Sequence, residues 1–396
     1  MNAWLVSQVI RLDRASTSRP SSSNTPHTLS GFAPQVVKSL NWSRSNTRRK
    51  SQIKHNLEQK MSPPNEVSAG ADHPVHHSQI EANGASFHVV EQGRGPVVLF
   101  LHGFPDTVET WRRQMQVVAE NGYRAIALDM RGFGDSYSPD DPALYSGAYI
   151  VGDLIGILDA LQVPTATIVS HDWGADHGQR AMVMRPDRFN GIITLSIPFL
   201  PRGELSTWDL LRSRGLGDLY YAFDMMKPET DDRIRDASKS ISSALYWLSG
   251  EPAEGTGWDP IDAKRNMFRP APDVLPSWAE PAYVKHNIET FQRTGFRGGL
   301  NQYRGVQATF EQLAAYKDVL IKQPSLYIWG DADGLCRLFH PVPPTVEEMR
   351  ETAPGLVDVI RLEGVGHWPH HEARDRVNAE IIRFLNGLNA TVSVSV

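Results

Sequence analysis

The sequence lacks three features, and each absence excludes a class of protein. Its 396 residues include a single cysteine, Cys336, which excludes a framework of disulfide bonds. No apolar run reaches the ~18 residues that a transmembrane helix needs. Acidic residues are scarce in residues 1–60, where two of them stand against ten Lys and Arg. From the first two absences we expect a soluble intracellular protein, as a monomer or a homodimer. No internal repeat of fixed period is visible.

Residues 1–60 are basic, rich in Ser, Thr and Asn, and show no core-forming pattern. The whole chain has a formal charge of −5, so the +8 of this segment leaves −13 on residues 61–396. This acidic remainder argues against binding to nucleic acid. We expect residues 1–77 to be a disordered extension, with two interpretations left open: a mitochondrial or plastid transit peptide, or a tail preceding a true start at Met61. We accordingly expect a cytoplasmic protein, or a plastid or mitochondrial one if residues 1–60 act as a transit peptide.

Strand-like and helix-like runs alternate in the rest of the chain. This alternation predicts an α/β fold with a mostly parallel, doubly wound sheet. It fails in residues 201–309, which are aromatic and helical in character. We therefore expect a helical lid there, inserted into a core of residues 78–200 and 310–390. The predicted strands are Phe87–Glu91, Val97–Leu101, Arg124–Leu128, Thr167–His171, Gly191–Leu195, Ser325–Trp329 and Val357–Leu362. The predicted helices are Thr110–Glu120, Ile150–Leu161, Ala175–Met184 and Arg374–Leu385.

Asp172 lies where one predicted strand turns into a predicted helix, in the run S-H-D-W-G. Ser170 and Gly174 supply the small side chains that a sharp turn requires, so the segment is typical of a nucleophile elbow with Asp in place of Ser. A carboxylate is ionised at pH 7, needs no base to activate it, and suits attack on saturated carbon. From this segment alone, a structural role for Asp172 as the N-cap of the following helix is equally consistent with the sequence.

Two later turns offer the base and the acid that such a hydrolase needs. His367 follows the predicted strand Val357–Leu362, and Asp333 follows Ser325–Trp329, with Asp331 as its competitor. Both come after the nucleophile in chain order, as this type of elbow requires. No Gly-x-Ser-x-Gly occurs in the chain, which disfavours a serine esterase.

The turn His102–Pro105 follows another predicted strand, and its proline is a candidate for a cis peptide bond. The backbone N–H groups of Phe104 and Trp173 are expected to form an oxyanion hole. His370 and His371 raise the alternative of a metal site, but their spacing fits no standard zinc pattern. We therefore expect no metal and no organic cofactor.

With these residues in place, residues 78 to 388 resemble the epoxide hydrolases of the α/β-hydrolase fold. The lid motif is the most specific part of the resemblance. One departure is the polar pair Asp176-His177, which stands where the family more often has apolar residues. The matching stretches are His102–Pro105 with Trp111-Arg112, Asp129–Ser136, His171–Ala175, Thr294–Arg304 and Gly366–Trp368.

The resemblance implies a reaction and two further site residues. An apolar epoxide and water would give a vicinal diol through an ester on Asp172. Tyr303 would hydrogen-bond the epoxide oxygen, and a second lid tyrosine would assist it. Tyr220 is our choice over Tyr221, although the register is not clean. The epoxide could derive from a fatty acid, a xenobiotic or secondary metabolism.

Two other functions remain open at this point. A haloalkane-type dehalogenase uses the same Asp, His and acid, but commonly has Asn at the position of Phe104 and does not need Tyr303. A ligand-binding homologue without turnover would have no use for both a nucleophile and a base.

Overall fold

The computed structural model describes residues 73–217, 219–339 and 344–394. The expected N-terminal extension therefore lies almost entirely outside the described residues. The first strand, β1, begins at His76, so the core starts two residues before the expected boundary at 78. Within the described ranges, no helix combines the length and the apolar character needed to cross a bilayer.

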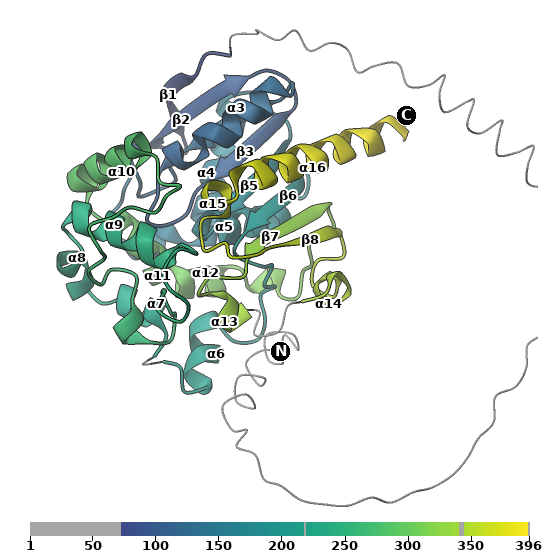
Figure 1. Cartoon of the computed structure of the whole chain (residues 1–396). Coiled ribbons are helices and arrows are strands. Elements are labelled where there is room, and N and C mark those ends of the chain that lie inside the picture. The colour runs from purple at the N-terminus through teal and green to yellow at the C-terminus, as the bar shows by residue number, and fades with distance from the viewer. Residues whose placement is uncertain (1–72, 218, 340–343, 395–396) are drawn as a thin grey trace, which may run out of the picture. The chain divides into compact units, whose positions relative to one another are not determined.

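The centre of the fold is an eight-stranded sheet in the order β1-β2-β4-β3-β5-β6-β7-β8 (Figure 1). β2 is antiparallel to its neighbours β1 and β4, and the remaining pairs are parallel. This arrangement confirms the predicted α/β fold with a mostly parallel sheet. The strands are β1 (His76–Ala82), β2 (Ala85–Gly93), β3 (Val97–Leu101), β4 (Arg124–Leu128), β5 (Ala166–His171), β6 (Phe189–Leu195), β7 (Ser325–Gly330) and β8 (Leu356–Leu362).

Two cores form because side chains alternate along each strand. In β3, Val98 and Phe100 join the core beneath α3 and α16, whereas Leu99 and Leu101 join the core beneath α4 and α5. The sheet is therefore covered on both faces, as the long apolar runs of its central strands require. These helices are α3 (Arg112–Glu120), α4 (Gly147–Ala160), α5 (Trp173–Met184) and α16 (Arg374–Val394).

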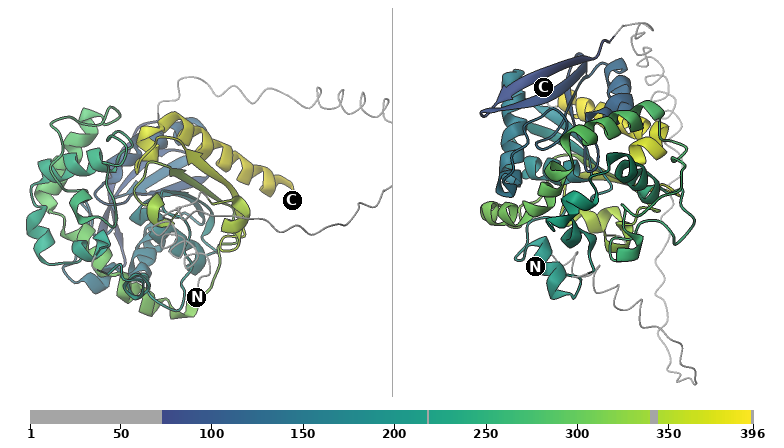
Figure 2. Two further views of the ribbon diagram at one scale, coloured as in Figure 1. Left: turned by 60° about the horizontal axis from the view of Figure 1, so that its bottom comes forward. Right: turned by 90° about the vertical axis from the view of Figure 1, so that its left-hand side faces the viewer.

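A set of helices is inserted between β6 and β7 and gathers at one side of the sheet (Figure 2). Lid residues Trp208, Tyr283 and Tyr303 share a hydrophobic core with Leu101 at the end of β3. The lid thus packs over the edge where β3 and β5 end. Its helices are α6 (Thr207–Ser213), α7 (Tyr221–Met225), α8 (Glu229–Arg233), α9 (Ala237–Leu248), α10 (Pro281–Thr294), α11 (Arg297–Arg304) and α12 (Val306–Gln312). After the lid come α13 (Cys336–Phe339), α14 (Val346–Arg350) and α15 (Pro369–Glu372).

Candidate active site

Asp172 forms the sharp turn between β5 and α5. Its φ is 51° and its ψ is −121°, a backbone conformation that a residue with a Cβ atom adopts only under strain. The close packing around it requires glycine: a Cβ on Gly174 would lie 2.2 Å from the carbonyl oxygen of Leu101, and a Cβ on Gly103 would lie 2.4 Å from the Cβ of Asp172. The sequence predicted this turn from its small residues, and the structure places it there.

The two carboxylate oxygens of Asp172 have different neighbours. The backbone N–H of Phe104 donates to Oδ1 at 2.9 Å, and the peptide bond between Phe104 and Pro105 is cis. Trp173 is the first residue of α5, so its N–H is one of the amides that a helix leaves without an internal partner. Of the two N–H groups expected to form the oxyanion hole, that of Phe104 already donates to the carboxylate, and that of Trp173 belongs to the residue directly after Asp172.

His367 lies between two carboxylates. Its Nδ1 donates to Oδ2 of Asp333 at 2.8 Å, and its Nε2 lies 3.6 Å from Oδ2 of Asp172. The competing acid, Asp331, instead accepts a hydrogen bond from Arg361 at 2.7 Å. The structure thus brings together Asp172, His367 and Asp333, as the chain order indicated.

The same neighbours set the charges of the site. Burial alone would lower the pKa of His367, but Asp333 and Asp172 outweigh it and raise that pKa to about 10. Burial alone would raise the pKa of Asp172, but His367 in particular holds it below its usual value. Burial, with a contribution from His367, lowers the pKa of His171 to about 3, and its Nε2 donates to the carbonyl oxygen of His367 at 2.7 Å. At neutral pH the site therefore holds an ionised Asp172 beside a protonated His367.

Three lid tyrosines face Asp172 across a cavity of about 100 Å³. The ring of Tyr303 lies 4.8 Å from that of Trp173 and 5.8 Å from that of Tyr221, whereas Tyr220 contacts Tyr221 at 4.9 Å. Burial raises the pKa of all three phenols, so each keeps its proton and can donate it. These ring contacts favour Tyr221 as the tyrosine that accompanies Tyr303, whereas the sequence analysis chose Tyr220 as the second lid tyrosine. Apolar side chains complete much of the wall: Ile197, Leu200, Trp208, Val306 and Leu335.

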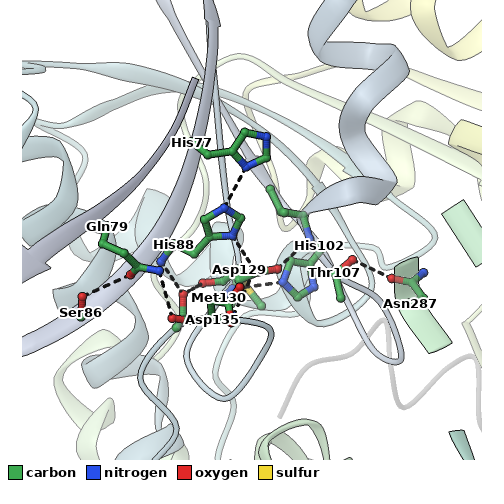
Figure 3. Close-up of polar contacts among 12 residues, drawn as sticks. His77, Gln79, Ser86, His88, His102, Thr107, Asp129, Met130, Asp135 and Asn287 are labelled. Carbon is green, nitrogen blue, oxygen red and sulfur yellow. Dashed lines mark hydrogen bonds and ion pairs between the residues drawn. The ribbon is translucent and has the colours of Figure 1, made fainter. Parts of the chain in front are cut away.

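A polar network fastens the loop after β3 that carries the Phe104 N–H (Figure 3). Asp129 accepts hydrogen bonds from the N–H of Val108 at 2.9 Å and from Nδ1 of His88 at 2.8 Å. The hydrogen bond to Asp129 raises the pKa of His88. Nε2 of His102 accepts from the N–H of Met130 at 3.1 Å. Sequence reasoning recognised the motif that begins at Asp129 but did not identify His88 as its partner.

A second buried cluster contains the two histidines that had suggested a metal. Asp106, His370 and His371 each offer a ligand atom, and these atoms lie within 4.8 Å of one another. The hydroxyl oxygen of Thr110, however, lies 2.8 Å and 2.9 Å from Nε2 of the two histidines. The hydroxyl of Tyr283 on α10 donates to Asp106 at 3.1 Å. These hydrogen bonds connect the lid to the core through the cluster, while Oδ2 of Asp106 and Nδ1 of His370 have no hydrogen-bond partner among the described residues.

Comparisons with known proteins agree with this fold and site. Residues 96–373 match the family model described as the alpha/beta hydrolase fold. An epoxide hydrolase of Caballeronia sordidicola is 48% identical over 329 residues, which cover 83% of this chain and 99% of that protein. Epoxide hydrolase 1 of Siraitia grosvenorii is 35% identical over 78% of this chain and 98% of its own length.

A solved structure gives the same result. The epoxide hydrolase from an endophytic Streptomyces superposes with a TM-score of 0.73 at 34% identity, covering 80% of this chain and 96% of that one. The chain therefore belongs to the epoxide hydrolases of the α/β-hydrolase fold, which confirms the resemblance found in the sequence.

Proposed function

We propose that the chain hydrolyses an apolar epoxide to a vicinal diol through a covalent ester on Asp172, using only its own side chains and water. The observation that carries this proposal is the position of one ionised carboxylate. Its Oδ1 is held by a backbone N–H, its Oδ2 faces His367, and it lines a largely apolar cavity with lid tyrosines opposite. Membership of the epoxide hydrolases supports the choice over a dehalogenase and over a binder without turnover.

In the first step, Asp172 attacks one carbon of the epoxide ring. The bond between that carbon and the ring oxygen breaks, and an ester forms. Negative charge develops on the ring oxygen, which is a poor leaving group unless it is stabilised. Tyr303 donates to this oxygen, assisted by Tyr221 or Tyr220. Removing such a donor costs roughly 100- to 1000-fold in rate where it acts on the charge of the transition state.

In the second step, water cleaves the ester. Once Asp172 is esterified its charge is lost, so His367 gives its proton to the alkoxide formed by ring opening and can then act as a base. It then takes a proton from water, which attacks the ester carbonyl carbon. The N–H groups of Phe104 and Trp173 stabilise the oxyanion, while Asp333 stabilises the imidazolium. Collapse of the intermediate breaks the bond between the carboxyl carbon of Asp172 and the substrate oxygen, which takes a proton from His367 and leaves in the diol as an oxygen that came from the carboxylate. The carboxyl group, which now holds the oxygen of water, returns its proton to His367 and is ionised again.

The test is to stop the reaction between the two steps. His367→Gln cannot act as a base, yet it leaves Asp172 ionised, so the variant should react once with an epoxide and then accumulate the ester. Intact-protein mass spectrometry should show one substrate mass added, located to the peptide that contains Ser170 to Gly174. In a serine-type enzyme the same change would prevent the covalent step, because there histidine activates the nucleophile.

Two variants complete this experiment. Asp172→Ala should neither gain mass nor form diol, while His371→Gln, a substitution outside the proposed machinery, should still turn over. A folded His367→Gln protein that binds the epoxide without gaining mass would contradict the assigned roles.

A further inference from the structure

An ion pair lies in the wall of the substrate cavity. Asp176 and Arg180 line this cavity together with Asp172, and all three belong to one face of α5 and its preceding turn because they are spaced four residues apart. Among the described residues that line the cavity, these three are the only charged ones. Asp176 is also half of the polar pair Asp176-His177 that the sequence analysis left without an explanation.

The ion pair lies nearer to solvent than the reacting groups do. The side chains of Asp176 and Arg180 are 30% and 22% exposed, whereas the side chain of Asp172 is 10% exposed and Tyr303 is buried. Each turn of four residues advances a helix by about 6 Å, so Arg180 begins about 12 Å beyond the nucleophile along α5. A substrate whose epoxide reaches Asp172 would therefore extend its other end along this pair.

Arg180 keeps a donor group free. Its Nε and Nη2 donate to the two oxygens of Asp176 at 2.8 Å and 2.7 Å. Its Nη1 makes no hydrogen bond to any residue within the described ranges. The chain also provides room for the side chain, because a Cβ on Gly147 would lie 2.6 Å from Cδ of Arg180. The guanidinium is thus held in place with one nitrogen unpartnered.

A purely structural role explains part of this arrangement. An Asp followed by an Arg four residues later stabilises an exposed helix by itself. That role does not require the pair to line a cavity that is otherwise mostly apolar, where partial burial of charge is unfavourable. It also does not use Nη1, the guanidinium nitrogen that has no hydrogen bond among the described residues, in a side chain that lines the cavity. Recognition of a ligand accounts for both.

We propose that this ion pair binds the far end of the substrate, so that the preferred epoxide carries an oxygen acceptor on the order of 10 Å from its ring. A hydroxyl, carbonyl or carboxylate oxygen would accept from Nη1 of Arg180. The inference rests on the proposed epoxide hydrolysis and adds the class of epoxide to it. The contact is made equally in the ground state and the transition state, so it should act on KM more than on kcat.

The experiment uses three terminal epoxides with the same chain, ending in a methyl, a hydroxyl or a carboxylate group. The wild-type protein should prefer both oxygen-ended epoxides to the methyl-ended one. Arg180→Met keeps the stem but removes the donors, and should lower kcat/KM for the preferred substrates by about 10- to 100-fold, the loss expected for a hydrogen bond to a charged group. The methyl-ended epoxide should change little. Asp176→Asn should favour the carboxylate further, because it removes the competing anion.

A matched control lies at the end of the same helix. Arg185 pairs with Asp187 on the surface at 2.7 Å, so Arg185→Met should leave all three substrates unaffected. Equal losses for the three epoxides in Arg180→Met would overturn the inference and leave a structural role for Arg180. So would a wild-type protein that hydrolyses all three equally well. If the wild type hydrolysed none of them, the proposed function itself would fail, and the inference with it.

Discussion

Replacing Asp172 with Asn should lower the pKa of His367 from about 10 toward neutrality. Asn has the size of Asp and the zero charge of the ester that forms during the reaction. Nε2 of His367 lies 3.6 Å from Oδ2 of Asp172. At an effective dielectric constant of about 20, two unit charges at that separation interact by roughly 5 kcal/mol, which corresponds to a few thousandfold in a protonation equilibrium. Removing one carboxylate is thus sufficient to convert His367 from an acid to a base at pH 7.

The pH dependence of the two steps follows from this change. In the free protein the pKa of His367 is raised, so the imidazolium predominates below about pH 10. The pKa of Asp172 is lowered, so the nucleophile stays ionised across the neutral range. Alkylation should therefore hold its rate as the pH falls through neutrality. Hydrolysis of the ester should slow over the same range, because His367 regains its proton once the pH falls below its pKa in the ester.

Nuclear magnetic resonance of protein labelled at histidine nitrogens can measure this directly. His367→Gln assigns the signal by its disappearance, and titrations of the wild type and Asp172→Asn then give the two pKa values. Asp331→Asn is the matched control, because that carboxylate pairs with Arg361 and not with His367. The same pKa for His367 in the wild type and in Asp172→Asn would refute the electrostatic reasoning. Single-turnover kinetics at several pH values would test the second step independently.

Further predictions concern the lid, the ester and the turn. Tyr303→Phe should slow alkylation far more than ester hydrolysis in rapid-quench experiments, and equal slowing of both steps would count against its role. Tyr221→Phe should slow alkylation more than Tyr220→Phe, and the reverse order would restore the sequence-based choice. With enzyme in excess in water enriched in heavy oxygen, the first diol should be unlabelled, because its new oxygen comes from Asp172. Gly103→Ala should abolish activity in a protein that circular dichroism shows to be folded, since its Cβ would lie 2.4 Å from the nucleophile's Cβ.

The interior strands and the edge strand β8 could be predicted from the sequence, whereas the other edge strand, β1, could not. Val97–Leu101 and Arg124–Leu128 were predicted with the bounds of β3 and β4, because parallel strands buried on both faces are continuous apolar runs. β1, His76–Ala82, is a largely exposed edge strand with polar residues, so no apolar pattern marks it. The available signal was Asn83-Gly84, a pair typical of a tight hairpin turn, and both residues have positive φ in the structure.

Chain order indicates which site residues come from strand ends, whereas the choice between Tyr220 and Tyr221 depends on how the lid packs. Asp172, Asp333 and His367 each follow a buried strand, and parallel strands bring their carboxyl ends to one edge. Tyr220 and Tyr221 differ by one position at the start of α7. Which of them faces Tyr303 depends on how that short helix docks, and sequence spacing carries no information about docking.

The two oxygens of Asp172 explain why one arrangement can serve both proposed steps. Oδ1 already accepts the N–H of Phe104, so in the ester it becomes the carbonyl oxygen without leaving its donor. Oδ2 lacks such a backbone donor at hydrogen-bond distance among the described residues and lies 3.6 Å from Nε2 of His367, which makes it the oxygen free to attack. When water later adds to the ester, the negative charge develops on Oδ1, where the donor already stands. No reorganisation is then required at the moment of reaction, which is the condition under which such donors stabilise a transition state most.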